Sequence, residues 1–181
     1  MAHIHIQAGQ VDQTVTAYVV RRDGDEIYVM LHMHKTRKKL LPVGGHIELD
    51  ETPWSAIRHE LQEESGYTLD ELKVLQPPAR IIHLHGAAVH PQPFVMHTHS
   101  ITQDHFHSDT SYLFMAQTEP RGPRADDESD DIRWLTRDGI ERLPSDKLLD
   151  NTRQICLAIF DVFLDDWQPV ETADFSLSKN M

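Results

Sequence analysis

Residues 45–67, GHIELDETPWSAIRHELQEESGY, carry the feature that most constrains this chain. Glu60, Glu63 and Glu64 stand three and four residues apart, behind a pair of glycines. Because an α-helix turns once in about 3.6 residues, this spacing predicts three carboxylates on one helix face. Like charges at that spacing repel and destabilise an isolated helix. The arrangement therefore suggests a bound cation, and Mg²⁺ prefers oxygen ligands of this kind.

A solvated acidic helix is the commoner origin of such a triplet, because glutamate is a good helix former. The surrounding residues favour a more specific interpretation. The pattern G-x5-E-x7-R-E-U-x-E-E-x-G-U, in which U is bulky and apolar, is filled by Gly45, Glu51, Glu60, Leu61, Glu63, Glu64, Gly66 and Tyr67. One position departs, since His59 stands where the pattern has arginine. This pattern is the Nudix box, and LLPVGGHIE at 40–48 also resembles the stretch that commonly precedes it.

The resemblance implies an α+β fold, a Nudix-type α/β/α sandwich with a central mixed sheet, in which the box forms a loop–helix–loop. It also implies a divalent-metal-dependent hydrolase that cleaves the phosphoanhydride bond of a nucleoside diphosphate linked to another group. The substrate would be a nucleotide sugar, ADP-ribose, a dinucleotide or a nucleoside triphosphate. Mg²⁺ or Mn²⁺ would neutralise charge on the phosphate oxygens and activate a water molecule.

Four residues of the box are the expected metal ligands. Glu60 and Glu64 should bind the ion directly, since a four-residue spacing stacks them on adjacent turns. Glu63 is expected to be a third ligand or the group that orients the attacking water. The resemblance implies the carbonyl oxygen of Gly45 as a further ligand.

Other residues of this segment are expected to shape the loop. Gly44 lets the backbone approach metal and phosphate, where a side chain would clash. Glu51 lies near the expected helix start, where the helix dipole favours a negative charge. Glu48 precedes the helix and could hold the loop or bind the ion through water. His59 faces Glu63 four residues further on.

The histidine at position 59 predicts a working site with less support than the family pattern provides. In that pattern the arginine supports a catalytic glutamate by ion pairing. An imidazole lacks the forked geometry of a guanidinium group and is only partly charged at neutral pH. We therefore expect activity that depends on pH between roughly 6 and 8.

The acidic run DDESDD at 126–131 offers one more candidate. Many Nudix proteins place an additional acidic residue in a loop near this point, as a metal ligand or general base. Glu128 is the first choice for that role here. A solvated charged loop is the alternative, and acidic runs are more often of that kind.

The chain contains thirteen histidines, and several are spaced two apart, as in 83/85, 97/99 and 105/107. Two such residues in a strand share one face of the sheet. Histidine pairs can bind zinc, but a zinc site needs ligands that converge from distant segments. No cysteine set or H-E-x-x-H motif supports such a site, so the sequence disfavours zinc.

The stretch HFHSDTSY at 105–112 resembles one seen in a subset of Nudix proteins, where it lines the substrate cleft. This implies substrate binding by His105, His107, Asp109 and Tyr112, with a polar strand start as the alternative. Tyr112 could stack on a base, although a buried core aromatic is the more frequent case. The basic loop Lys35–Lys39 and Phe94 are further candidates for substrate contacts.

The composition fits one globular domain. A chain of 181 residues, 39% hydrophobic and 25% charged, can bury a sizeable core. The net charge of −12 disfavours binding to a nucleic-acid backbone, which needs clustered lysine and arginine. A single cysteine, Cys156, excludes an internal disulfide and suits the cytoplasm. We expect no signal peptide, since MAHIHIQAGQ has no long apolar run, and no membrane span.

The hydrophobic pattern predicts a single domain over 1–181, with its core at about 12–166 and a polar, loose tail at about 168–181. The chain should begin with a β-hairpin, followed by a short strand and a helix from Thr52-Pro53 to Gly66. The expected strands are 14–21, 26–32, 40–43, 69–74, 80–85, 94–99, 110–118 and 132–135, and a last helix is expected at about 145–165.

Two other functions remain open. A catalytically weak nucleotide-binding regulator with a degenerate box would account for His59. An isomerase acting on an isoprenyl diphosphate can carry the same box, but it needs a cysteine or comparable acid in its cleft. Cys156 lies on the apolar stripe of the last helix, which argues against that activity. Exposed strand edges would also permit a homodimer.

Overall fold

The structure is a computed structural model that describes residues 7–126 and 128–175. Its strands are β1 (Gln10–Asp23), β2 (Glu26–Met33), β3 (Leu40–Leu41), β4 (Val43–His46), β5 (Leu72–Gln76), β6 (Val95–Thr102), β7 (His105–Ala116), β8 (Ile132–Leu135) and β9 (Gln168–Glu171). Its α-helices are α1 (Pro53–Glu60), α2 (Arg137–Arg142), α3 (Asp150–Ala158) and α4 (Leu164–Asp166). Two π-helical turns, η1 (Leu61–Ser65) and η3 (Ile159–Phe163), and two 3₁₀ turns, η2 (Leu69–Glu71) and η4 (Thr172–Asp174), join them.

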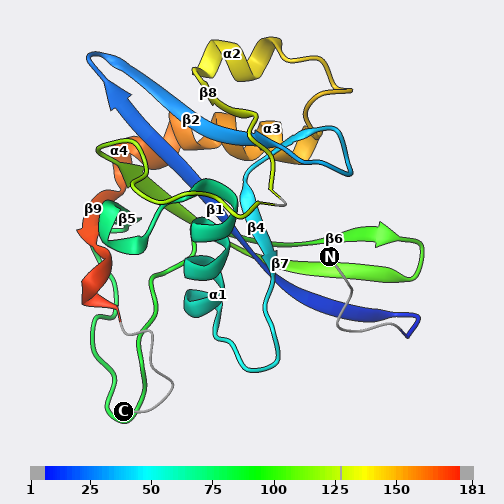
Figure 1. The fold of residues 1–181 in the computed structure, drawn as a ribbon. Coiled ribbons are helices and arrows are strands. Elements are labelled where there is room, and N and C mark those ends of the chain that lie inside the picture. Colours follow the sequence, from blue (N-terminus) through cyan, green and yellow to red (C-terminus); the bar gives the residue numbers. More distant parts are fainter. Residues whose placement is uncertain (1–6, 127, 176–181) are drawn as a thin grey trace.

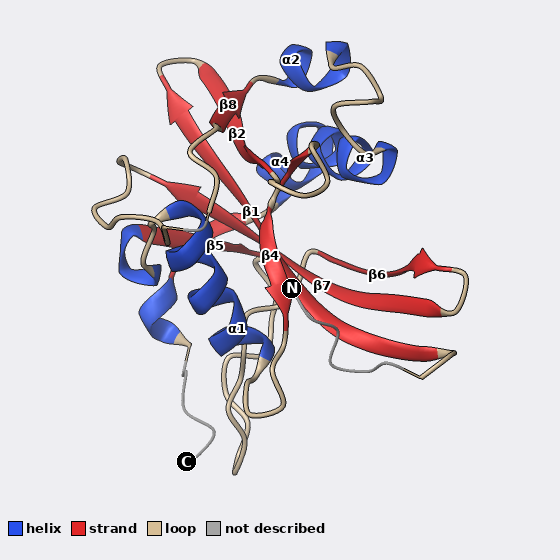
Figure 2. Ribbon diagram, turned by 45° about the vertical axis from the view of Figure 1, so that its right-hand side comes forward, coloured by secondary structure: helices blue, strands red, loops and turns tan. Residues whose placement is uncertain are grey.

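The strands form one mixed sheet around β1. This strand runs parallel to β7 and antiparallel to β2 and β4. The strand order is β3-β2-β1-β7-β5-β9, and β4, β6 and β8 pair with β1, β7 and β2. Helix α1 covers one face of the sheet, whereas α2 and α3 cover the other (Figure 1 and Figure 2). The structure thus confirms the predicted α/β/α sandwich with a central mixed sheet.

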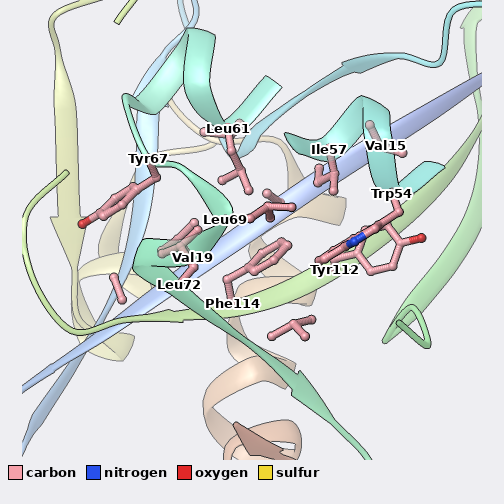
Figure 3. Close-up of a cluster of buried hydrophobic side chains, with 14 of the residues drawn as sticks. Val15, Val19, Trp54, Ile57, Leu61, Tyr67, Leu69, Leu72, Tyr112 and Phe114 are labelled. Carbon is pink, nitrogen blue, oxygen red and sulfur yellow. The ribbon is translucent and has the colours of Figure 1, made fainter. Parts of the chain in front are cut away.

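Alternating side chains of β1 supply two apolar cores, one on each face of the sheet. Val15 and Val19 pack with Trp54 of α1 on one face (Figure 3). Tyr18 packs on the opposite face, in a cluster with Ile159 beyond α3. By the same alternation, even-numbered positions of β1 face α3 and odd-numbered positions face α1. This division also separates two clusters of polar side chains.

The ends of the box helix follow the predicted local rules. Thr52 caps α1 by accepting a hydrogen bond from the Ser55 N–H at 3.1 Å, and Pro53 fills the first turn. Gly66 ends the helix in the left-handed conformation, with φ of 76°. The helix is not α-helical throughout, however, because its second half is the wider π-helical turn η1.

The predicted strand at 80–85 is wrong. This segment belongs to a long loop whose pairing is limited to an isolated bridge between Leu84 and Ala87. Ile81 and Ile82 are 65% and 74% exposed. Their apolar pattern resembles a strand, but both edges of β7 are already paired with β1, β5 and β6.

Several other boundaries differ from the predicted ones. Strand β5 begins after a 3₁₀ turn, and β7 begins at His105, so the HFHSDTSY stretch lies inside a strand. The last helix starts at Asp150 rather than near 145 and passes through a π-helical turn. Gln168–Glu171 is not a loose tail, since it forms β9 and pairs with β5. The rest of that predicted tail, 176–181, lies outside the described residues. Within the described ranges, no helix combines the length and the apolar character that a membrane crossing requires.

Candidate active site

Two glutamates of the box are buried, and one of them contacts the glycine pair of β4, Gly44 and Gly45. Glu60 and Glu64 are only 8% and 6% exposed. Glu64 Oε2 accepts a hydrogen bond from the Gly44 N–H at 2.8 Å, which ties the helix to β4. Gly45 is also buried and lies opposite Val15 of β1. The structure thus brings the Glu64 carboxylate to the glycine pair, with buried Glu60 four residues earlier in the helix.

Glu63 departs from the predicted common face. Its side chain is 50% exposed, and its Oε1 lies 2.9 Å from Nε2 of His59. The other imidazole nitrogen, Nδ1, lies 3.6 Å from Glu51 Oε1. Glu51 Oε2 in turn accepts a hydrogen bond from the N–H of Glu48 at 3.2 Å. These contacts connect the start of the loop to the exposed edge of the helix.

Two residues from other segments reach Glu64. His32 of β2 places Nε2 3.5 Å from Glu64 Oε2, and both side chains are buried. Ligand atoms of His32, Glu64 and Glu128 lie within 4.8 Å of one another. Glu128 was the acidic residue expected from the 126–131 run, of which Asp127 lies outside the described residues. His32 carried no sequence signal, because only the pairing of β2 with β3 and β8 brings it here.

Electrostatics favour a cation at this position. Burial raises the pKa of Glu64 to about 9; the Gly44 N–H opposes this, and Glu60, Glu128 and Glu63 add to it. Burial also raises the pKa of Glu60 to about 7. Buried carboxylates that lie close together keep their protons, because the ionised forms lose hydration and repel one another. A divalent ion would displace those protons and satisfy the same oxygens.

Sterics also require glycine at position 44, in addition to the hydrogen bond that its N–H donates to Glu64. A Cβ at this residue would stand 2.2 Å from the carbonyl oxygen of Val15, since β4 passes closely over β1. The close packing of β4 on β1 therefore requires glycine at position 44, and its role in admitting metal and phosphate stays a prediction.

A cavity of about 310 Å³ lies beside β4. Gly44, Gly45 and His46 of β4 form part of its wall, and the beginning of α3 lies across from them. The loop after β2 contributes His34 and Arg37. The cavity thus extends from the glycine pair of β4 towards the basic loop that was expected to contact substrate.

The even-numbered face of β1 forms a polar wall of this cavity. Asp109 is 4% exposed, and its carboxylate accepts hydrogen bonds from Thr14 at 2.9 Å, Thr16 at 2.8 Å and Ser111 at 2.6 Å. His107 also lines the cavity. Burial lowers the pKa of His107 to about 4, and neighbouring histidines add to the effect, so its imidazole is neutral at pH 7.

Two aromatic residues expected to contact substrate lie in the cores instead. Tyr112 is 2% exposed and packs edge-on against Trp54, with ring centroids 5.6 Å apart (Figure 3). Phe94 packs edge-on against Tyr18 and Phe163 on the opposite face. Neither Tyr112 nor Phe94 lines the cavity, so neither ring is placed to stack on a substrate there.

A family model described as "NUDIX domain" matches residues 12–155. The chain belongs to the Nudix family. A search of curated proteins found no match. Family membership, together with a similar structure of a NUDIX-family hydrolase at 26% identity, supports a pyrophosphohydrolase. Nudix hydrolases use divalent metal ions, and the described residues include groups that could hold one.

Solved structures of Nudix proteins share the fold. A hydrolase of the NUDIX family from Clostridium perfringens is 26% identical, with a TM-score of 0.68 over 83% of this chain and 97% of that chain. An Ap4A hydrolase from C. elegans, in a binary complex, is 15% identical, with a TM-score of 0.62 over 85% and 98%. The NUDIX domain of Shewanella oneidensis NrtR, complexed with ADP ribose, is 14% identical, with a TM-score of 0.57 over 82% and 86%.

Proposed function

We propose that the protein hydrolyses the phosphoanhydride bond of a nucleoside diphosphate linked to another group, using Mg²⁺ or Mn²⁺. One observation carries this proposal. The buried carboxylate of Glu64 accepts a hydrogen bond from Gly44 of β4, buried Glu60 stands four residues before it, and Gly44 and Gly45 also line a cavity of about 310 Å³. That volume lies within the range of small-molecule sites.

The donor set fits a hard dication. Carboxylate oxygens of Glu60, Glu64 and Glu128 would hold the ion, with Glu63 and the Gly45 carbonyl oxygen as additional ligands by family resemblance. The raised pKa values of Glu60 and Glu64 indicate that a bound cation would stabilise their ionised forms. When bound, the ion stabilises negative charge on the phosphate oxygens as a Lewis acid.

Other residues of the chain would orient the water molecule and bind the substrate. Glu63 is half exposed and held by His59, so its free oxygen can orient a water molecule at the edge of the site. Arg37 is exposed at the basic loop and can pair with phosphate. Apolar side chains such as Leu41 and Ile155 offer the cavity a surface for the nucleoside.

A substrate screen tests the proposal. ADP-ribose, a nucleotide sugar, diadenosine tetraphosphate and ATP are each incubated with the full chain and Mg²⁺ or Mn²⁺, and nucleotide products are separated chromatographically. We expect turnover of at least one compound and none with a chelator. Glu64→Gln should lower kcat by roughly a hundredfold or more, because the ion supplies several kcal/mol of stabilisation.

A matched control separates this effect from a general loss of acidic charge. Glu141 is an exposed residue of α2 that pairs with Arg137, and Glu141→Gln should keep the kcat of the parent chain. Tight nucleotide binding without turnover would instead favour the nucleotide-binding regulator. Turnover that persists in Glu64→Gln would overturn the assignment of the carboxylate site.

A further inference from the structure

The second polar cluster lies on the opposite side of the sheet from α1. Asp12 of β1 pairs in register with His107 of β7, and His105 lies two residues before it on the same face. His46 of β4 pairs with Thr14 of β1, and its side chain reaches the same cluster. Three strands that are distant in the sequence therefore bring these side chains together, as a zinc site requires.

The distances within this cluster are compatible with ligands of one metal ion. Asp12 Oδ2 lies 3.2 Å from His105 Nε2 and 3.4 Å from His46 Nε2. The Nε2 atoms of His46 and His107 are 3.3 Å apart. Two atoms bound tetrahedrally at about 2.0–2.1 Å from one ion are separated by roughly 3.3–3.4 Å. One ligand atom each from Asp12, His105 and His107 also lies within 4.8 Å of the others.

Burial points in the same direction. Asp12 is 0% exposed and His107 is 9% exposed. Burying a carboxylate is unfavourable unless a cation or strong hydrogen bonds compensate its charge. Three imidazoles around one carboxylate form a nitrogen-rich set that suits a first-row transition ion, whereas the oxygen-only glutamates suit Mg²⁺ or Mn²⁺.

We propose that Asp12, His105 and His107, with His46 as the fourth ligand, bind one transition-metal ion, most naturally Zn²⁺. The site is separate from the glutamate site, because even-numbered residues of β1 face α3 and the box helix packs on the other face. His46 and His107 also line the cavity, so the ion faces the same space as the expected substrate. These histidines then serve the metal rather than contacting the substrate directly.

Metal titration of the full chain without an affinity tag tests this proposal. After treatment with a chelator, the protein is titrated with Zn²⁺ by calorimetry, and bound zinc is measured by elemental analysis. Co²⁺ serves as a spectroscopic probe, since tetrahedral nitrogen and oxygen ligation gives an intense visible absorption. We expect one equivalent of Zn²⁺ that remains bound in excess Mg²⁺, which occupies the glutamate site, and that absorption.

Paired variants make the test specific. The double variant His105→Gln/His107→Gln should lose the equivalent of zinc and weaken the affinity by at least a hundredfold. The matched double variant His83→Gln/His85→Gln removes a second histidine pair of the same spacing from the exposed loop, and it should bind like the parent chain. Circular dichroism and melting curves confirm that each variant is folded.

Two further results decide the outcome. Glu60→Gln/Glu64→Gln should keep the zinc equivalent, because the carboxylate site lies on the other face. The proposal is overturned if the folded parent chain takes up no zinc, which would make the cluster a hydrogen-bond network. It is also overturned if the His105→Gln/His107→Gln variant retains the full equivalent.

Discussion

His59 and Glu63 form a contact of 2.9 Å between Nε2 and Oε1, on the exposed side of the helix that carries the buried carboxylates. The same imidazole reaches towards Glu51, 3.6 Å from its Nδ1. The histidine therefore bridges two glutamates of the box with its two ring nitrogens. The family pattern has an arginine here, and the histidine keeps part of its geometry without the fork of a guanidinium group.

This contact predicts that His59 positions Glu63. His59→Ala should lower kcat by roughly tenfold or more, as removal of supporting hydrogen bonds commonly does. His59→Arg should hold or raise kcat, because a forked guanidinium group can hold Glu63 through two parallel hydrogen bonds. Steady-state kinetics of both variants provide the measurement.

The neighbouring Arg58 offers a control, since it is also exposed and stands about 100° around the helix. Arg58→Ala should leave kcat unchanged. A collapse of activity in His59→Arg would show that the imidazole has a role of its own, beyond holding Glu63.

The buried carboxylates predict how stability and metal binding depend on pH. Burial raises the pKa of Glu64 from 4.5 to about 9 and that of Glu60 to about 7. Between pH 4.5 and 9 the folded, metal-free chain therefore holds protons that the unfolded chain has lost, so its stability falls as pH rises. Metal binding displaces these protons, and the apparent affinity should rise up to tenfold per pH unit for each proton released.

Thermal melts at pH 6 and pH 8.5, with a chelator or with Mg²⁺, test this expectation. The Tm gained on adding Mg²⁺ should be larger at the higher pH. Glu64→Gln has no proton to release at that position and should show a smaller difference. An equal gain at both pH values in the parent chain would contradict a protonated carboxylate site.

Local signals in the sequence predicted the parts of the fold that depend on neighbouring residues. Thr52 and Gly66 set the ends of the box helix through a cap and a left-handed residue, so their positions could be predicted from the chain alone. The hairpin of β1 and β2 and the short strand β8 are likewise confirmed.

Contacts between distant segments could not be predicted in this way. Asp12 meets His107 only because β1 and β7 pair in parallel, with a register that no local pattern encodes. His32 reaches Glu64 for a similar reason. Ile81 and Ile82 gave a strand-like pattern, but a strand also needs an edge to pair with, and that is a property of the sheet.

We expect substitution of Gly66 to lower the free energy of unfolding strongly. Its φ is 76°, and a Cβ would lie 2.4 Å from the carbonyl oxygen of Gly122. Gly24 in the hairpin turn also has a positive φ, of 59°, but a Cβ there meets nothing within 4 Å. Gly24→Ala should therefore cost about 1–2 kcal/mol for the left-handed conformation alone.

Gly66→Ala should cost at least about 1–3 kcal/mol more than its control, because backbone must move to relieve the clash. Urea unfolding of both variants gives the comparison. If the two variants were equally stable, the close approach between Gly66 and Gly122 would not constrain the fold.

Cys156 should be unreactive in the native protein. The thiol is 0% exposed within the apolar cluster on α3, and burial raises its pKa to about 12. At pH 8 only roughly one thiol in ten thousand would then be the reactive thiolate. An aromatic disulfide reagent should label the folded chain only over hours but react fully within minutes in denaturant. The variant Cys156→Ser supplies the blank for reagent decay. Rapid labelling of the native chain would place the thiol in an open cleft and restore the isomerase as a candidate, because that reaction requires an accessible acid or thiol.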